Sequence, residues 1–173
     1  HERGVNKEEL AVKEVELGQH CQRRQPQNVE CDYRLAIALG QQAREKTSTG
    51  KDALGHIVDL LHKAIAGKPD LESGGPHRVL AMVLLRAPSW PVGPGDPEAG
   101  LDEARAAVQR FPDQADNQLA LGEALAANNA RAEAHVASTR ALALATSANA
   151  AGDVAAAKTV ADAKAGVEKT AGL

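Results

Sequence analysis

The chain has 173 residues, of which 43% are hydrophobic and 2% aromatic, and its formal net charge is −3. This apolar content is enough for one continuous core, so a disordered chain is not expected. No concentrated basic run is present, which argues against nucleic-acid binding, and no apolar stretch approaches the ~18 residues of a membrane-spanning helix. Alanine, leucine and valine must fill the core, and alanine has the highest helix propensity, so the composition predicts an all-α fold.

The first two predicted helices cover residues 7–24 and about 28–46. Asn6 and Glu9 have the spacing of a capping box at the start of the first helix. The sequence QPQN is expected to end that helix. The sequence TSTG at residues 47–50 is expected to end the second one.

Cys21 and Cys31 are the only cysteines of the chain. They fall near the end of the first predicted helix and the start of the second, and an antiparallel hairpin brings such positions together. A disulfide and two buried free thiols are both compatible with this placement. No further cysteine or close histidine pair completes a zinc-binding pattern.

The next predicted helices cover residues 51–67, 75–87 and 97–110. Apolar residues of the first recur at intervals of three and four, as on one face of an amphipathic helix. Pro76 stands in a first helical turn, where its missing N–H costs nothing. Pro88 disfavours helix at the residue before it and therefore ends the second of these helices.

A proline-rich loop separates the last two of these helices. Its sequence, RAPSWPVGPGDPEAG, has a proline at every third position from 88 to 97 around Trp90, the single tryptophan. This spacing suits the three-residue turn of a polyproline II segment, so we expect a stiff, extended bridge. Trp90 is then either an anchor packed into the groove between repeated helix pairs, which we favour, or an exposed contact for a partner.

Three further helices are predicted at about 116–127, 130–146 and 150–170, which makes eight helices and no strand. The last is rich in alanine, with Val154, Val160 and Val167 about two turns apart. We expect it to cap the apolar end of the preceding helices, a flexible tail being the alternative.

The helices pair into a repeat. The stretch LALGEALAANNARAEAHVASTRALALA has small residues where two antiparallel helices would cross and larger apolar residues beside them, at the spacings of a tetratricopeptide repeat: Leu121, Gly122, Leu125, Ala134 and Ala141. The prediction is a single all-α domain, 1–173, a tetratricopeptide-like helical-hairpin solenoid of about three repeats. Its parts are an N-terminal helix in 1–27, repeats at 28–70, 73–113 and 114–146, and a capping helix or tail in 147–173. The proline-rich loop is an insertion in the second repeat.

Residues 74–125 resemble the tetratricopeptide-like T-component proteins associated with TRAP transporters, the tripartite ATP-independent periplasmic uptake systems. The shared features are a Gly-Gly-x-x-Arg helix, an Ala-Pro-x-x-Pro loop followed by Gly-Asp, a Pro-Asp helix end and a Gly-Glu-Ala-Leu helix: Gly74, Gly75, Arg78, Ala87, Pro88, Pro91, Gly95, Asp96, Pro112, Asp113, Asn117, Gly122, Glu123, Ala124 and Leu125. The resemblance implies a periplasmic, lipid-anchored protein that assembles with the solute receptor of the transporter. The first residue is His1 rather than methionine, which agrees with a processed chain whose signal and lipid anchor lay upstream.

In this repeat the first helix of each pair lines the concave surface. Aligning the Leu-Gly sites places ten residues on that surface: Arg34, Ile37, Gln41, Arg44, Arg78, Met82, Leu85, Arg86, Leu119 and Glu123. Arginines beside aliphatic groups can receive a carboxylate-bearing ligand or an acidic peptide. A solvated face on which arginine stems cover apolar surface is the alternative. With Trp90, these are the candidate residues for binding a partner or ligand.

Catalytic, metal and cofactor sites are not predicted. The chain lacks the HExxH, GxSxG, P-loop and GxGxxG patterns, and His56 and His62 would point about 120° apart on one helix, too far for one metal ion. Two functions remain. One is a periplasmic accessory protein that binds a partner, such as a TRAP solute receptor, together with an organic acid. The other is a generic scaffold of a multiprotein envelope or motility complex.

Overall fold

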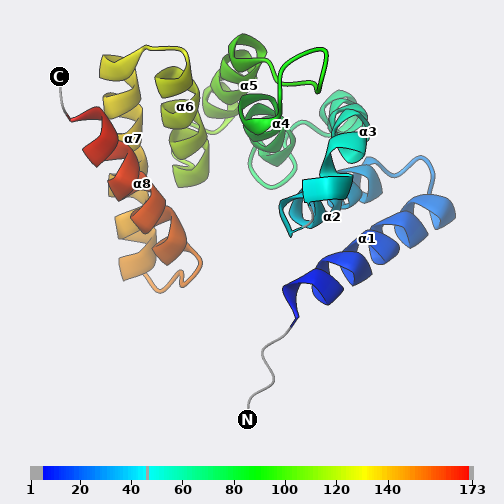
Figure 1. Ribbon diagram of the computed structural model, residues 1–173. Coiled ribbons are helices and arrows are strands. Elements are labelled where there is room, and N and C mark those ends of the chain that lie inside the picture. Colours follow the sequence, from blue (N-terminus) through cyan, green and yellow to red (C-terminus); the bar gives the residue numbers. More distant parts are fainter. Residues whose placement is uncertain (1–5, 46, 172–173) are drawn as a thin grey trace.

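The computed structural model describes residues 6–45 and 47–171, and within these ranges the protein is all-α, with eight helices and no sheet. The helices are α1 (Lys7–Arg24), α2 (Val29–Glu45), α3 (Thr47–Gly67), α4 (Gly75–Arg86), α5 (Pro97–Arg110), α6 (Ala115–Ala127), α7 (Arg131–Ala150) and α8 (Ala156–Thr170). They pack as consecutive antiparallel pairs, α2 with α3, α4 with α5 and α6 with α7. In Figure 1 the pairs follow one another in an arch, with α1 at one end and α7 and α8 at the other. None of the described helices is long and apolar enough to cross a membrane.

The helix starts follow the capping signals of the sequence. The Asn6 side chain accepts a hydrogen bond from the Glu8 amide at 3.1 Å at the start of α1. The Asp96 side chain does the same for the amides of Glu98 and Ala99 at the start of α5, where Pro97 occupies the first turn. Each cap satisfies backbone donors that have no partner inside the helix.

Three predicted helix boundaries are wrong: the start of α3, the end of α7 and the start of α8. Residues 47–50 form the first turn of α3 and not a break, because serine and threonine favour helix starts as strongly as they interrupt helix interiors. The seventh helix was expected to end at about Thr146, but α7 continues to Ala150. The eighth was expected to begin at Ala150, but α8 begins at Ala156. Gly152, with φ +100°, occupies the turn between α7 and α8.

The first helix pairs enclose a core of large side chains. Its fully buried members come from α2, α3 and α4: Tyr33, Leu35, Ile57, Leu60, Leu61 and Leu80. In contrast, the last pairs are packed mainly through alanine: Ala104, Ala124, Ala134, Ala137 and Ala141.

The crossing of α6, α7 and α8 depends on small residues. A Cβ atom at Gly122 would lie 2.6 Å from the Ser138 hydroxyl oxygen, and one at Gly166 would lie 2.9 Å from it. The buried positions of α8 are Ala156, Ala163 and Thr170. Val160 and Val167, two of the three valines expected on this face, are partly buried. Val154 is exposed and precedes the helix.

A disulfide joins α1 to α2. It links Cys21 with Cys31, whose Cα atoms are 5.5 Å apart. The Gln22 amide beside it donates a hydrogen bond to the Asp32 carboxylate at 2.7 Å. Of the two alternatives left open by the sequence, the structure contains the disulfide, which fits an oxidising compartment outside the cytoplasm.

Candidate binding groove

A groove of about 650 Å³ runs along α2, α4 and α6, which we call the inner helices, and reaches α8. Its floor is mainly aliphatic: Ile37, Leu54, Ile57, Val79, Met82, Val83, Leu119 and Ala120. Its rim carries charged side chains of both signs: Arg44, Arg78, Arg86 and Lys158, with Glu72, Asp116, Glu123 and Asp162. An apolar floor with polar groups around it is the usual composition of a ligand-binding cleft.

Most residues predicted for the concave surface line this groove. They are Ile37, Arg44, Arg78, Met82, Arg86, Leu119 and Glu123. Gln41 and Arg34 are not among its lining residues, although Arg34 forms an ion pair with Glu72 of the rim at 3.4 Å. Seven of the ten residues that share the first-helix register thus line one groove, and their role in binding stays a prediction.

Leu85 was also predicted for the concave surface, and it is not among the residues that line the groove. This side chain packs with the alanine-rich core of the later pairs, and its Cγ atom would lie 3.1 Å from a Cβ atom at Gly100 of α5. Its packing against α5 accounts for its absence from the groove.

Arg78 is held in the groove by a buried amide. Its guanidinium donates to Asn117 Oδ1 at 2.7 Å, and the Asn117 side chain is fully buried. The Asn117 amide nitrogen donates in turn to the carbonyl oxygens of Ser73, Ala107 and Phe111 at 3.0–3.3 Å. Asn117 thus connects α4, α5 and α6 and fixes the arginine that faces the groove.

The Gly-Gly pair at the start of α4 has a structural cause. Gly74 has φ +85°, in the left-handed region that favours glycine. A Cβ atom at Gly75 would collide with the Tyr33 hydroxyl group, which donates to Glu72 Oε2 at 3.1 Å. Burial raises the pKa of the Tyr33 hydroxyl group, and the neighbouring Glu72 carboxylate adds to this shift.

Most charges at the rim are already paired within the protein. Arg86 donates to Glu123 at 2.9 Å, and Lys158 donates to Asp162 at 2.6 Å. Arg44, in the last turn of α2, makes no hydrogen bond or ion pair with the described residues. It is therefore the cation most available to an anionic group of a ligand.

Sequence reasoning missed several groove residues, above all Tyr33, Glu72, Lys158 and Asp162. Lys158 and Asp162 come from α8, which was expected only to cap the array. A hydrogen bond from the Thr159 hydroxyl group to Asp116 at 2.7 Å holds α8 against α6. The i, i+4 spacing of Lys158 and Asp162 predicts an ion pair on one helix face, but nothing in it indicates that this face borders a groove.

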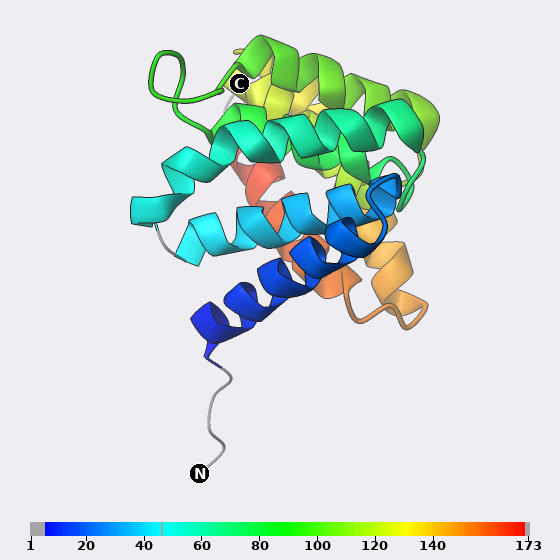
Figure 2. The same ribbon diagram turned by 90° about the vertical axis from the view of Figure 1, so that its right-hand side faces the viewer.

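The proline-rich loop is not a polyproline II segment. Its backbone folds back on itself, with hydrogen bonds from Gly95 N to Pro88 O at 2.8 Å and from Val92 N to Ser89 O at 3.1 Å. Polyproline II has no internal hydrogen bonds, so the glycines between the prolines decide this conformation. The anchor interpretation of Trp90 is also wrong, because 86% of this residue is exposed. Figure 2 shows the loop, in green, projecting from the start of α5.

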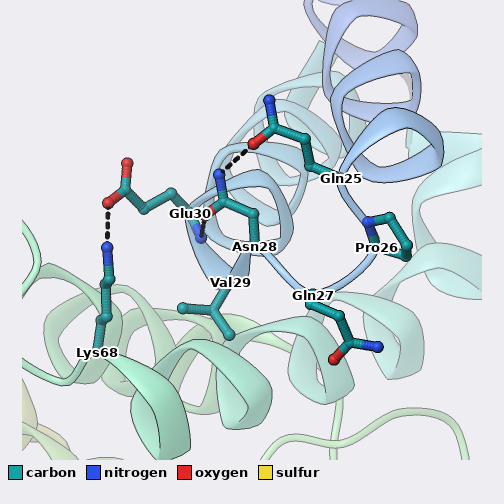
Figure 3. Close-up of a pocket in the computed structure, with 7 residues that line it drawn as sticks. All are labelled: Gln25, Pro26, Gln27, Asn28, Val29, Glu30 and Lys68. Atoms are coloured by element: carbon teal, nitrogen blue, oxygen red, sulfur yellow. Dashed lines mark hydrogen bonds and ion pairs between the residues drawn. The ribbon is translucent and has the colours of Figure 1, made fainter.

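A second hollow, of about 530 Å³, lies at the turn between α1 and α2. Figure 3 shows its lining residues, with Lys68 donating to Glu30 at 2.6 Å and the Asn28 amide donating to Gln25 at 2.8 Å. The Lys68 ammonium group holds the pKa of the Glu30 carboxyl below its ordinary value. Because its polar groups bond to one another and most of its residues are exposed, this hollow is a weaker candidate site than the groove.

No cluster of three or more metal-ligating side chains occurs among the described residues. No protein-family model matches the chain, and neither does any curated protein. A proposal for the function therefore rests on the geometry and chemistry of the groove.

Proposed function

We propose that this chain is a periplasmic, tetratricopeptide-like accessory protein that binds a partner along the groove of its inner helices. In this proposal the three antiparallel pairs are three repeats, α1 and α8 cover their ends, and the partner is a solute receptor of a TRAP transporter. The groove also receives an organic acid, whose carboxylate pairs with Arg44.

The observation that carries the proposal is the aliphatic groove floor shared by three successive inner helices. Polar bonds between successive inner helices support their interpretation as one array. Arg78 and Arg86 of α4 donate to Asn117 and Glu123 of α6. Tyr33 of α2 donates to Glu72, in the turn before α4.

The compartment is supported by the disulfide between Cys21 and Cys31. The family is supported by the residues shared with T-component proteins, several of which have structural roles in this chain. Gly75 makes room for Tyr33, and Asn117 fixes Arg78.

The proposal is tested by titrating the purified protein with TRAP-type solute receptors in a calorimeter. Arg44→Glu and Met82→Glu alter the rim and the floor of the groove without removing a described hydrogen bond. Arg131→Glu is the matched control, because Arg131 is an exposed arginine on α7 that also has no described ion pair. We expect the two groove variants to weaken binding about tenfold or more and the control to leave it unchanged.

A thermal-shift series with small mono- and dicarboxylates tests the ligand. A bound acid at 100 times its Kd stabilises a protein by about 2.7 kcal/mol, and Arg44→Glu should abolish that gain. If receptors bind equally to all three variants, or only surfaces outside the groove matter, the generic scaffold function replaces this proposal.

A further inference from the structure

We infer that the partner seated in the groove is a polypeptide that also covers Trp90 and Val92 at the tip of the proline-rich loop. This inference rests on the proposed function and names the kind of partner. Trp90 is 86% exposed and Val92 is 56% exposed, so both side chains are available at the loop tip.

The loop holds this tip in a defined shape. Besides the hydrogen bonds inside the loop, the Asp96 amide donates to the Leu84 carbonyl oxygen of α4 at 2.9 Å. Gly93 and Gly95 permit the tight fold, because a Cβ atom at Gly93 would lie 2.7 Å from Pro88 O and one at Gly95 would collide with the Ala87 carbonyl. A large aromatic side chain presented by an ordered backbone loses little conformational entropy on binding.

The root of the loop adjoins the groove. Ala87 and Pro88, at the root of the loop, are lining residues of the groove. A tryptophan buries at most ~250 Å², whereas a stable protein interface needs about 800 Å² on each partner. Trp90 and Val92 are therefore too small to form an interface alone, and the adjoining groove supplies the remaining area.

The charges around the loop tip do not suit a lipid surface. Residues 87–95 contain no charged side chain, and the acidic residues Asp96 and Glu98 follow them directly. Arg86, before the loop, is already paired with Glu123. Interfacial membrane binding draws on basic residues beside the apolar ones, and this tip has none free.

Random peptides displayed on phage and selected on the immobilised protein provide the test. The peptides should be about 16 residues long, enough to span ~50 Å when extended, and those that contain tryptophan are discarded so that emission reports only Trp90. We expect the free protein to emit like a water-exposed tryptophan and the bound protein to show a blue shift. Trp90→Ala should weaken binding about 30-fold, whereas Trp90→Phe should retain most of it.

The controls separate this inference from the proposed function. Val92→Ser should weaken binding, and Val136→Ser, at an exposed valine of α7, should not. If Met82→Glu weakens peptide binding but Trp90→Ala does not, the groove binds polypeptides without the loop. The inference about the loop is then overturned, while the proposed function stands. If carboxylates bind in the groove and no peptide is retained, the inference fails while the ligand site stands. If neither peptides nor carboxylates bind, and the solute receptors do not bind in the calorimeter either, both proposals fail.

Discussion

The two halves of the protein are packed by opposite means. In the first half, α2, α3 and α4 enclose large side chains such as Leu60 and Leu61. In the second half, α6, α7 and α8 approach closely through alanine, glycine and Ser138. The first half is thus stabilised by large side chains that fill its core. The second half needs small side chains, because its helices approach one another closely. The groove joins the two, because its lining residues come from both.

The largest expected effect is the loss of a filled volume in the first half. Leu60→Ala removes a fully buried side chain of α3 and should destabilise the protein by about 2–5 kcal/mol. Leu17→Ala, at an exposed leucine of α1, should cost less than about 0.5 kcal/mol. Urea denaturation of both variants measures the difference, and equal losses would contradict the assigned core.

Loss of the disulfide should cause the next largest loss of stability. The bond closes a short loop between residues 10 apart, for which chain entropy gives a stabilisation of about 3 kcal/mol. We expect the Cys21→Ser, Cys31→Ser variant to exchange its α1 amides faster while those of α7 stay protected. Faster exchange spread evenly over the chain would show that α1 is not held locally by this bond.

Adding side-chain volume to the core of the second half should destabilise the protein by about 1–3 kcal/mol. Ala141→Leu adds volume at a fully buried position of α7, where the neighbouring helices leave no room. Ala143→Leu makes the same change at an exposed position of that helix and should be nearly neutral. A comparison of their thermal midpoints measures the effect, and a stabilising Ala141→Leu would reveal a void in place of close packing.

The smallest effect appears at high pH. The folded-state pKa of Tyr33 lies above its unfolded value of about 10, so its contribution is fully present below about pH 10 and is lost as the pH rises towards the folded pKa. Between the unfolded-state and the folded-state pKa, the free energy of unfolding should fall by up to about 1.4 kcal/mol per pH unit. Tyr33→Phe should remove this part of the alkaline loss. Tyr33 is the only tyrosine, so phenolate absorbance reports it alone, and a titration near pH 10 would contradict its burial.

The fold could be predicted from the sequence where local chemistry decides it. The caps at Asn6 and Asp96 and the helix-ending Pro88 mark helix boundaries without reference to distant residues. The TSTG segment was misassigned because the same residues can end one helix and begin the next. The proline spacing was misleading because the intervening Gly93 and Gly95 allow a folded loop.

The groove could be predicted only in part. The register of the inner helices placed Met82 and Glu123 correctly, since both depend on helix periodicity. Trp90 could not be placed, because burial depends on whether another element covers the loop. The contributions of Glu72 and Lys158 depend on a turn and a terminal helix whose positions no local pattern sets.

In these proposals the inner-helix groove and the proline-rich loop bind the partner together. Hydrogen exchange of the protein, with and without a bound TRAP-type receptor or a selected peptide, shows which segments the partner covers. We expect slower exchange in residues 87–96 and in the inner helices α2, α4 and α6. Protection confined to α1 or to the outer surface of α7, with the loop unchanged, would contradict the claim.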